Sequence, residues 1–321
     1  MKALRVAVVG TGSIARNYHL PSLARLEREG TVELVAAVDR DEDRVRDAAA
    51  RFGVRRRYAD YREMLERETP DAVWLLVPTA VIADVAGYFL ARGVPAMIEK
   101  PPASSVAEAR ALLDIAQAHG TPHQVAFNRR HAPLLTRMKE LLTEAGETTA
   151  LSCQFFRYRR GEPEFAYGTG LHGLDALRFL GDGEVCAVET RASRAGAAAI
   201  TLEYSNGAHA VMEMLPQVGV QSERYTAHAG ERTVMADGMI GWLTRYPGFL
   251  RCYDSGHETL YVDNGAEDQP PEVVSGFYGE DAHFVHCLQR GEKPGPDLAA
   301  SLRSLEIAEA VQRGVSATFP V

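Results

Sequence analysis

The first 127 residues alternate between short apolar runs and longer stretches in which apolar side chains recur with helical spacing. The apolar runs, each short enough to be a buried strand, are residues 4–9, 32–38, 71–77 and 95–98, and a further strand is predicted over residues 123–127. Helical spacing follows at residues 16–28, 42–52, 82–92 and 106–119, and Pro21 is expected to kink or split the first of these helices. Such alternation predicts an α/β unit, in which a parallel sheet is covered by helices on both faces.

From about residue 150 the pattern changes to a series of strands. The predicted strands are residues 151–157, 185–192, 199–204, 208–215, 225–229 and 233–236. One helix, 171–180, interrupts them, and a C-terminal helix is predicted over 297–314. Consecutive strands with few helices favour an α+β domain built on a large, mostly antiparallel sheet.

A chain of 321 residues suits two domains. We expect a first domain over residues 1–125 and a second over 126–321, with the C-terminal helix packing back on the first domain.

Composition narrows the class of protein. Hydrophobic residues make up 46% of the chain, yet no apolar run approaches the roughly 18 residues that a membrane span requires. The N-terminal apolar run is too short for a signal peptide, so we expect a cytoplasmic protein. The formal net charge of −8 argues against a nucleic-acid partner, and Arg55–Arg57 is expected to be a solvated face.

Cysteine and histidine spacing argues against a metal site. The four cysteines, Cys153, Cys186, Cys252 and Cys287, contain no Cys-x-x-Cys pair, and we expect reduced thiols in the core. His283 and His286 are three residues apart, but no carboxylate motif of suitable spacing lies near them, so no metal is expected.

A glycine-rich turn follows the first predicted strand and opens the first helix. It comprises Gly10, Thr11, Gly12, Ser13, Ile14 and Ala15. Glycines at these positions allow a tight turn and a close approach of the backbone to a pyrophosphate, which binds at the helix N-terminus. We therefore expect a doubly wound Rossmann domain that binds a nicotinamide dinucleotide.

The second strand ends at Asp39, where a carboxylate accepts hydrogen bonds from the adenosine ribose. Since a carboxylate repels a 2′-phosphate, Asp39 favours NAD as the cofactor. Arg40 points the other way, because its guanidinium can stack on adenine or pair with a 2′-phosphate, and NADP remains the alternative.

Glu99 and Lys100 follow another predicted strand, at the edge of the sheet where ligands bind. Lysine is rare here: of 35 basic residues only Lys2, Lys100, Lys139 and Lys293 are lysines. A lysine beside an oxidised nicotinamide ring is driven toward its neutral form and becomes a better proton acceptor. On position alone, a catalytic lysine and a salt-bridged surface loop are equally compatible with the sequence.

Taken together, the motifs resemble those of the glucose-fructose oxidoreductase, inositol dehydrogenase and rhizopine-catabolism family (Gfo/Idh/MocA). The resemblance covers most of the chain and rests on Gly10-x-Gly12-x-x-Ala15, Val77-Pro78-Thr79, Glu99-Lys100-Pro101, Phe127-Asn128-Arg129-Arg130 and His172-Gly173-Leu174-Asp175. It implies an NAD(P)-dependent oxidoreductase that moves a hydride between the nicotinamide and a hydroxyl-bearing carbon of a sugar, polyol or related small molecule. It also implies that the second domain binds the substrate and mediates association into a homodimer or homotetramer.

The resemblance assigns roles to residues. Lys100 and His172 are the implied catalytic residues, with Glu99 orienting Lys100 and Pro101 shaping the loop. The implied cofactor-binding residues are Gly10, Thr11, Gly12, Ser13, Ile14, Ala15, Asp39, Arg40, Val77, Pro78, Thr79, Glu99, Lys100 and Asn128. The implied substrate-binding residues are Lys100, Arg129, Thr169, His172 and Asp175. Without the resemblance, His172 is better explained as a histidine that caps the start of a helix.

One position departs from the family. An aspartate commonly lies four residues before the histidine, whereas this chain has Gly168, which supplies neither charge nor proton. Tyr167 or Thr169 is available to contribute a hydroxyl instead. Two alternatives therefore stay open: a non-catalytic NAD(P)-binding sensor or regulatory protein, and an enzyme that uses transient oxidation for elimination or glycoside cleavage.

Basic residues also cluster where the first strand of the second domain ends, at Arg157, Arg159 and Arg160 with Tyr158 between them. Such a cluster is able to contact an anionic substrate. We expect instead that it forms an exposed basic edge of the sheet.

Overall fold

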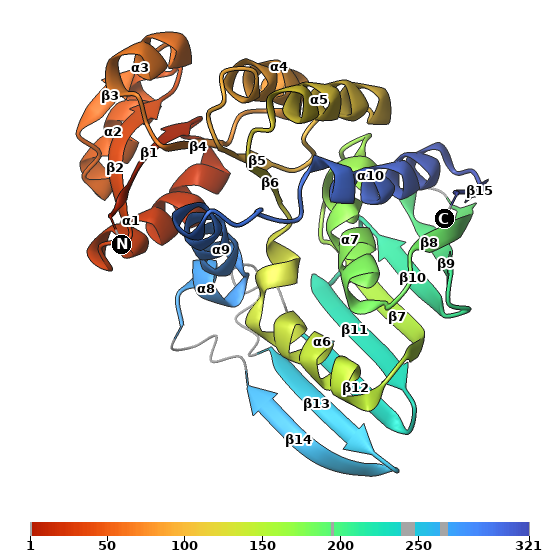
Figure 1. Ribbon diagram of the computed structural model, residues 1–321. Coiled ribbons are helices and arrows are strands. Elements are labelled where there is room, and N and C mark those ends of the chain that lie inside the picture. Colours follow the sequence, from red (N-terminus) through yellow and green to blue (C-terminus); the bar gives the residue numbers. More distant parts are fainter. Residues whose placement is uncertain (1, 194–195, 239–247, 264–268, 321) are drawn as a thin grey trace. The chain divides into compact units, whose positions relative to one another are not determined.

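The structure, a computed structural model, describes residues 2–193, 196–238, 248–263 and 269–320 (Figure 1). The chain divides into two compact units. Unit 1 contains Met1–Phe127 and Phe277–Leu302, and unit 2 contains Asn128–Gly276 and Arg303–Val321.

Unit 1 is built on a six-stranded sheet with the order β3-β2-β1-β4-β5-β6, in which every pair of neighbours is parallel. The strands are β1 (Leu4–Val9), β2 (Val32–Val38), β3 (Arg56–Tyr58), β4 (Ala72–Leu75), β5 (Ala96–Glu99) and β6 (His123–Ala126). The helices are η1 (Ala15–His19, a π-helical turn), α1 (Leu20–Arg28), α2 (Glu42–Phe52), α3 (Tyr61–Glu68), α4 (Thr79–Leu90), α5 (Val106–His119) and α9 (Phe277–Arg290). The predicted doubly wound parallel sheet is confirmed, and the strand order reverses between β1 and β4.

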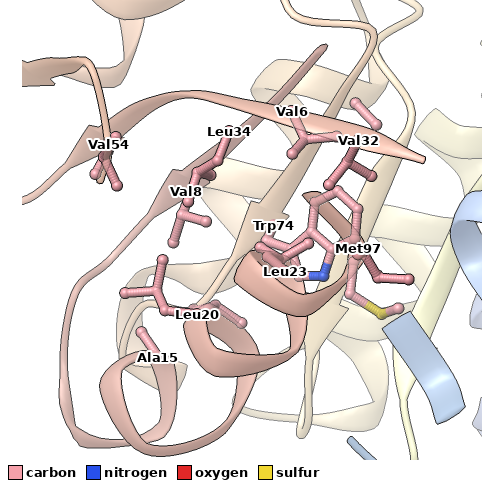
Figure 2. Packing of buried hydrophobic residues seen from close by; sticks show 14 of the residues in the cluster. Val6, Val8, Ala15, Leu20, Leu23, Val32, Leu34, Val54, Trp74 and Met97 are labelled. Atoms are coloured by element: carbon pink, nitrogen blue, oxygen red, sulfur yellow. The ribbon is translucent and has the colours of Figure 1, made fainter. Parts of the chain in front are cut away.

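The core of unit 1 forms where helices pack on this sheet. Val6 and Val8 on β1, Leu20 and Leu23 on α1, and Trp74 on β4 are almost completely excluded from solvent (Figure 2). Phe284 of α9 joins the same cluster and packs edge-on against Trp74, with ring centroids 5.3 Å apart.

Unit 2 is built on a nine-stranded sheet with the order β14-β13-β12-β11-β7-β10-β9-β8-β15. Its strands are β7 (Thr148–Phe156), β8 (Val185–Ala192), β9 (Ala198–Tyr204), β10 (His209–Leu215), β11 (Ser222–Ala229), β12 (Arg232–Asp237), β13 (Phe249–Asp254), β14 (His257–Asp263) and β15 (Ala317–Thr318). β7 and β10 pair in parallel, and the other neighbours are antiparallel. The predicted, mostly antiparallel sheet is thus confirmed.

The helical segments of unit 2 are η2 (Asn128–His131), α6 (Pro133–Ala145), η3 (Ala166–Gly170, a second π-helical turn), α7 (Leu171–Leu180) and α8 (Pro271–Val274), while α10 (Leu298–Arg313) starts in unit 1 and continues in unit 2. The helix predicted over 171–180 is confirmed as α7, whereas α6, which precedes the strand series, was not predicted. Helix α6 is amphipathic and buries Leu134, Leu135, Met138, Leu141 and Leu142.

The two units also differ from the two predicted domains, which are separated by one boundary near residue 125. Residues Phe277–Leu302, which we expected to belong to the second domain, are part of unit 1. The four cysteines form no disulfide, and three are buried, whereas Cys186 is only half-buried. Among the described residues, no helix is long and apolar enough to cross a lipid bilayer.

Candidate active site and cofactor site

The glycine turn lies at the carboxyl end of the unit 1 sheet. There it contacts the backbone where β2 and β4 end. Gly10 adopts a positive φ of +97°, and its N–H donates to the carbonyl of Val38 at 2.8 Å. A Cβ at this position would lie 2.4 Å from the carbonyl oxygen of Leu76, so only glycine fits. A Cβ at Gly12, by contrast, would meet nothing within 4 Å. The turn therefore leaves open space at Gly12, in front of a helix N-terminus, as a bound pyrophosphate requires.

The two glycines predict separable effects on stability and on cofactor binding. Gly10→Ala is expected to lower the free energy of unfolding by about 1–3 kcal/mol, because the backbone must shift away from Leu76. Gly12→Ala is expected to leave stability unchanged and to weaken NADH binding, since its methyl group occupies only the open space. Urea denaturation and NADH fluorescence titration of both variants measure the two effects. Equal stability of the two variants would contradict the prediction.

Asp39 is held in place at the end of β2. Its carboxylate accepts hydrogen bonds from the backbone N–H of Thr11 at 2.7 Å, from the Thr11 hydroxyl at 2.9 Å and from the backbone N–H of Asp41 at 3.0 Å. Burial alone raises the pKa of Asp39, but these hydrogen bonds and the charge of Arg44 outweigh it and lower the pKa below its usual value. The group is therefore a fixed anion next to the glycine turn. Arg40 is exposed to solvent.

The other residues expected at the cofactor site follow β4 and β5. Val77 and Pro78 lie in the short connection between β4, which ends at Leu75, and α4, which Thr79 begins. Glu99 is the last residue of β5 and is 9% exposed, and Lys100 follows it, half-buried, with a cis peptide bond to Pro101. Because β1, β4 and β5 are parallel neighbours, these residues lie at the same end of the sheet as Gly10, the end where the strands finish. Two strand spacings, about 10 Å, separate β1 from β5.

A buried polar network in unit 1 was not found from the sequence. His19, at the end of η1, has no exposed surface, and its Nδ1 lies 2.9 Å from a carboxylate oxygen of Asp281 on α9. The same oxygen accepts a 2.7 Å hydrogen bond from the indole N–H of Trp74. Burial lowers the pKa of His19, but Asp281 and, to a smaller extent, Glu99 raise it above its usual value overall. Asp281 is more than 200 residues away in sequence from both His19 and Trp74, so no local sequence pattern predicts these contacts.

In unit 2, His172 is the second residue of α7 and is half-buried. The π-helical turn η3 leads directly into this helix, and π turns occur frequently at functional sites. Gly168 lies within that turn, and a Cβ there would meet nothing within 4 Å. The missing aspartate thus corresponds to open space rather than to a position filled by another side chain.

Thr169 belongs to a closed ring of hydrogen bonds. Its hydroxyl donates to Glu162 at 3.0 Å and accepts from a guanidinium nitrogen of Arg160 at 2.8 Å. Arg160 in turn donates through Nε to both carboxylate oxygens of Glu162, at 2.9 and 3.1 Å. Thr169 was expected from the sequence, but the contribution of Glu162 was not.

Asp175 has no exposed surface and is held entirely by neighbouring side chains. Arg130 donates two hydrogen bonds of 2.8 Å to its carboxylate, and the hydroxyl of Ser304 on α10 donates a third at 2.7 Å. This geometry fits a residue that anchors α7, so Asp175 is not carried into the functional proposal below.

Arg129 and Arg157 converge on one buried carboxylate. Glu223 on β11 has no exposed surface, and it accepts hydrogen bonds from Arg129 at 2.7 and 3.1 Å and a further one from Arg157. The expectation that Arg157 forms part of an exposed basic edge was wrong: it is 3% exposed because Glu223 compensates its charge, whereas Arg159 and Arg160 are exposed. Arg129, only 7% exposed, is committed to the same pair. Asn128 donates its side-chain amide to the carbonyl of Ser275 at 2.7 Å.

The chain is similar to known oxidoreductases. A family profile described as "Oxidoreductase family, NAD-binding Rossmann fold" matches residues 4–127. The D-xylose 1-dehydrogenase (NADP(+)) 2 of Haloferax volcanii is 30% identical, over 95% of both chains. The chain belongs to the Gfo/Idh/MocA oxidoreductase family.

Other members of the Gfo/Idh/MocA family agree with this assignment. The D-apiose dehydrogenase of Paraburkholderia graminis is 25% identical over 97% of this chain and 87% of its own. Among solved structures, a dehydrogenase from Chromobacterium violaceum superposes with a TM-score of 0.86 at 19% identity, covering 98% of this chain and 96% of its own, which shows the shared fold.

As a Gfo/Idh/MocA protein, the chain is an oxidoreductase that uses a nicotinamide dinucleotide. The residues present fit that cofactor: Gly10 closes the turn against Leu76, Gly12 leaves space, and Asp39 presents a fixed carboxylate. Within the described part of the chain, no group of three or more His, Cys, Asp or Glu side chains is arranged to hold a metal ion.

Proposed function

We propose that the protein oxidises a hydroxyl-bearing carbon of a sugar or polyol while NAD or NADP is reduced, or reduces the corresponding carbonyl while NADH or NADPH is oxidised. When bound, the nicotinamide supplies the hydride acceptor or donor. The proposal rests mainly on the position of Glu99 and Lys100 at the carboxyl end of β5. The glycine turn lies at the same end of the sheet. The dehydrogenase names of the relatives support the substrate class.

In this proposal, some residues of the chain bind the cofactor and others act on the substrate. The turn around Gly10 and Gly12 binds the pyrophosphate, and Asp39 accepts hydrogen bonds from the adenosine ribose. Lys100 takes the proton from the reacting hydroxyl through Nζ, and Glu99 orients it. His172 acts on the substrate as a proton-transfer or hydrogen-bonding partner. Association into a homodimer or homotetramer stays a prediction.

We further propose NAD as the preferred cofactor, on the evidence of the fixed anionic Asp39. Asp39→Ala is expected to shift the ratio of NADPH to NADH affinity about tenfold toward NADPH, because it removes the repulsion of a 2′-phosphate. Fluorescence titration with both reduced cofactors measures the ratio. Asp43→Ala, which changes an exposed aspartate of the same region, is the control. An unchanged ratio in Asp39→Ala would exclude Asp39 as the discriminating residue.

A turnover assay tests the function directly. D-xylose, myo-inositol and other sugars and polyols are supplied with NAD or NADP, and formation of the reduced cofactor is followed by absorbance. Turnover on any of them supports the proposal. Tight NADH binding with no reduction on the whole panel would instead favour a non-catalytic binding protein, and substrate cleavage without net NADH would favour elimination or glycoside cleavage.

A further inference from the structure

Unit 1 encloses a histidine that the proposed function does not use. His19 is the last residue of the π-helical turn η1, and neither its side chain nor that of Asp281 on α9 has any exposed surface. The ring of Phe277 packs edge-on against the imidazole, with ring centroids 5.1 Å apart, and stacks on Tyr18 at 4.3 Å. Because these rings exclude water, a charge on His19 is screened less than a surface charge and acts over a longer distance.

The contacts of His19 favour its protonated form. Its Nδ1 lies 2.9 and 3.2 Å from the two carboxylate oxygens of Asp281, and the nearer oxygen also accepts the indole N–H of Trp74. Burial lowers the pKa of His19, but the charge of Asp281 and the hydrogen bond to it outweigh burial, so the pKa is raised. In the described part of the chain, no group hydrogen-bonds to Nε2. The core of unit 1 thus holds an imidazolium of which one N–H is not compensated by a hydrogen bond.

Glu99 lies on the side of the sheet where this pair is buried. Trp74 on β4 and Met97 on β5 are paired in register, and both point into the core to which α1 and α9 contribute (Figure 2). Because side chains alternate between the two faces of a strand, Glu99, two residues after Met97, points to the same face. Glu99 is 9% exposed, and its charge also favours the protonated form of His19. The imidazolium and the Glu99 carboxylate therefore stabilise each other.

The other titratable groups around the imidazole are mostly acidic. α9 contributes Glu280 and Asp281, both without exposed surface, and β5 contributes Glu99. β6 contributes an uncharged side chain, Gln124, whose amide donates to the backbone carbonyl of Glu280 at 3.4 Å. The buried residues of α1 are uncharged, and η1 adds the phenol of Tyr18. The imidazolium therefore supplies the positive charge among these carboxyl groups.

This charge matters for Lys100, which follows Glu99 directly and must be neutral to accept a proton. An anion beside a lysine favours the protonated ammonium, whereas a nearby cation disfavours it. Glu99 alone would therefore hold Lys100 in the form that is unable to accept a proton. A buried cation that shares the field of Glu99 opposes this effect.

We propose that His19, ionised through Asp281, is a positioning residue for the reaction: its charge offsets that of Glu99 and thereby favours the neutral, proton-accepting form of Lys100. The inference rests on the proposed function, because it concerns the protonation of the base in that reaction. His19 acts through Glu99 and needs no contact with the substrate.

NMR of the lysine side chains measures this effect without turnover. The chain has four lysines: Lys2, Lys100, Lys139 and Lys293. Selective lysine labelling of the NAD-bound protein therefore gives few signals, and Lys100→Ala identifies the one that belongs to Lys100. Its pKa is compared between the wild type and His19→Asn, in which the amide retains a donor for Asp281 but carries no charge.

His19→Asn is expected to raise the pKa of Lys100 by about 0.5–1 pH unit, the effect of removing one cation about 10 Å away in a partly hydrated site. With a substrate found in the panel, the acidic limb of the kcat/KM profile should move to higher pH by the same amount. On that limb, kcat/KM should fall about 3- to 10-fold. The Kd of NADH should remain at its wild-type value.

Trp74→Phe is the matched control, because it removes the other hydrogen bond to the same oxygen of Asp281 and leaves the charge of His19 in place. Both variants are expected to lower the melting temperature, but only His19→Asn should shift the pKa of Lys100. A purely structural role for His19 would lower the melting temperature in both variants and leave the pKa of Lys100 unchanged in both.

Three results overturn the inference: an unchanged pKa of Lys100 in His19→Asn, an equal shift in Trp74→Phe, or a neutral His19 ring at pH 7. The last is read from the imidazole nitrogen shifts of the wild type and needs no folded variant. Turnover with an unchanged pKa of Lys100 leaves the proposed function intact and removes His19 from it. The expected shift without turnover on the whole panel supports the electrostatic coupling, and in that case the redox function fails alone.

Discussion

Replacing Glu223 by glutamine is expected to lower the free energy of unfolding by about 3–5 kcal/mol, the cost of removing one partner from a buried ion pair. The carboxylate has no exposed surface and compensates both Arg129 and Arg157, which are 7% and 3% exposed. Without it, the two guanidinium groups lose the buried carboxylate that they share. Urea denaturation measures the loss.

Glu213→Gln provides the control, because Glu213 lies on the exposed face of β10 in the same sheet. Its substitution should change stability by no more than about 0.5 kcal/mol. A loss below about 1 kcal/mol in Glu223→Gln would mean that the surrounding structure relaxes around the two guanidinium groups.

The same residue predicts a pH dependence. Burial raises the pKa of Glu223, but the two arginines outweigh burial and lower it from 4.5 to about 2. A carboxyl group whose pKa is lower in the folded state stabilises the fold fully above its unfolded pKa. Its contribution is then lost as the pH falls from about 4.5 to about 2. The difference in stability between wild type and Glu223→Gln should therefore shrink over this range.

Lys100→Ala is expected to reduce kcat about 100-fold or more, because it removes the group that accepts the proton of the reacting hydroxyl. NADH affinity should change little, since the pyrophosphate and ribose are bound by the glycine turn and Asp39. Steady-state assays on a substrate identified in the panel, together with NADH titration, separate the two quantities.

The control for Lys100→Ala is Lys2→Ala, which removes an exposed lysine. It should retain full activity. Undiminished turnover in Lys100→Ala would remove Lys100 from the mechanism and would leave its position on the sheet edge without a catalytic explanation.

The parallel sheet of unit 1 could be predicted because most of its strands are rich in apolar residues and are followed by a helix with regular spacing. β3 and α3 escaped detection for a physical reason. β3 is a three-residue edge strand with exposed Arg56 and Arg57, and α3 buries only Met64 completely, so neither carries a hydrophobic pattern.

The glycine turn and the Glu99–Lys100 pair could be located from the sequence because their geometry is set by neighbours along the chain. Side chains that act through distant partners could not. Arg157 looked exposed because its partner, Glu223, is 66 residues away, and Glu162 gave no signal because its role depends on the fold of the turn that carries Thr169.

The way the chain passes between the two units has a consequence for synthesis on the ribosome. Trp74 obtains the acceptor for its indole N–H only when Asp281 emerges, 207 residues later, and α7 obtains the Ser304 hydroxyl bond to Asp175 later still. Neither core can be completed until the last helices have left the ribosome. The nascent polypeptide therefore exposes apolar surface throughout most of translation, and the loss of α10 would leave both units unfinished.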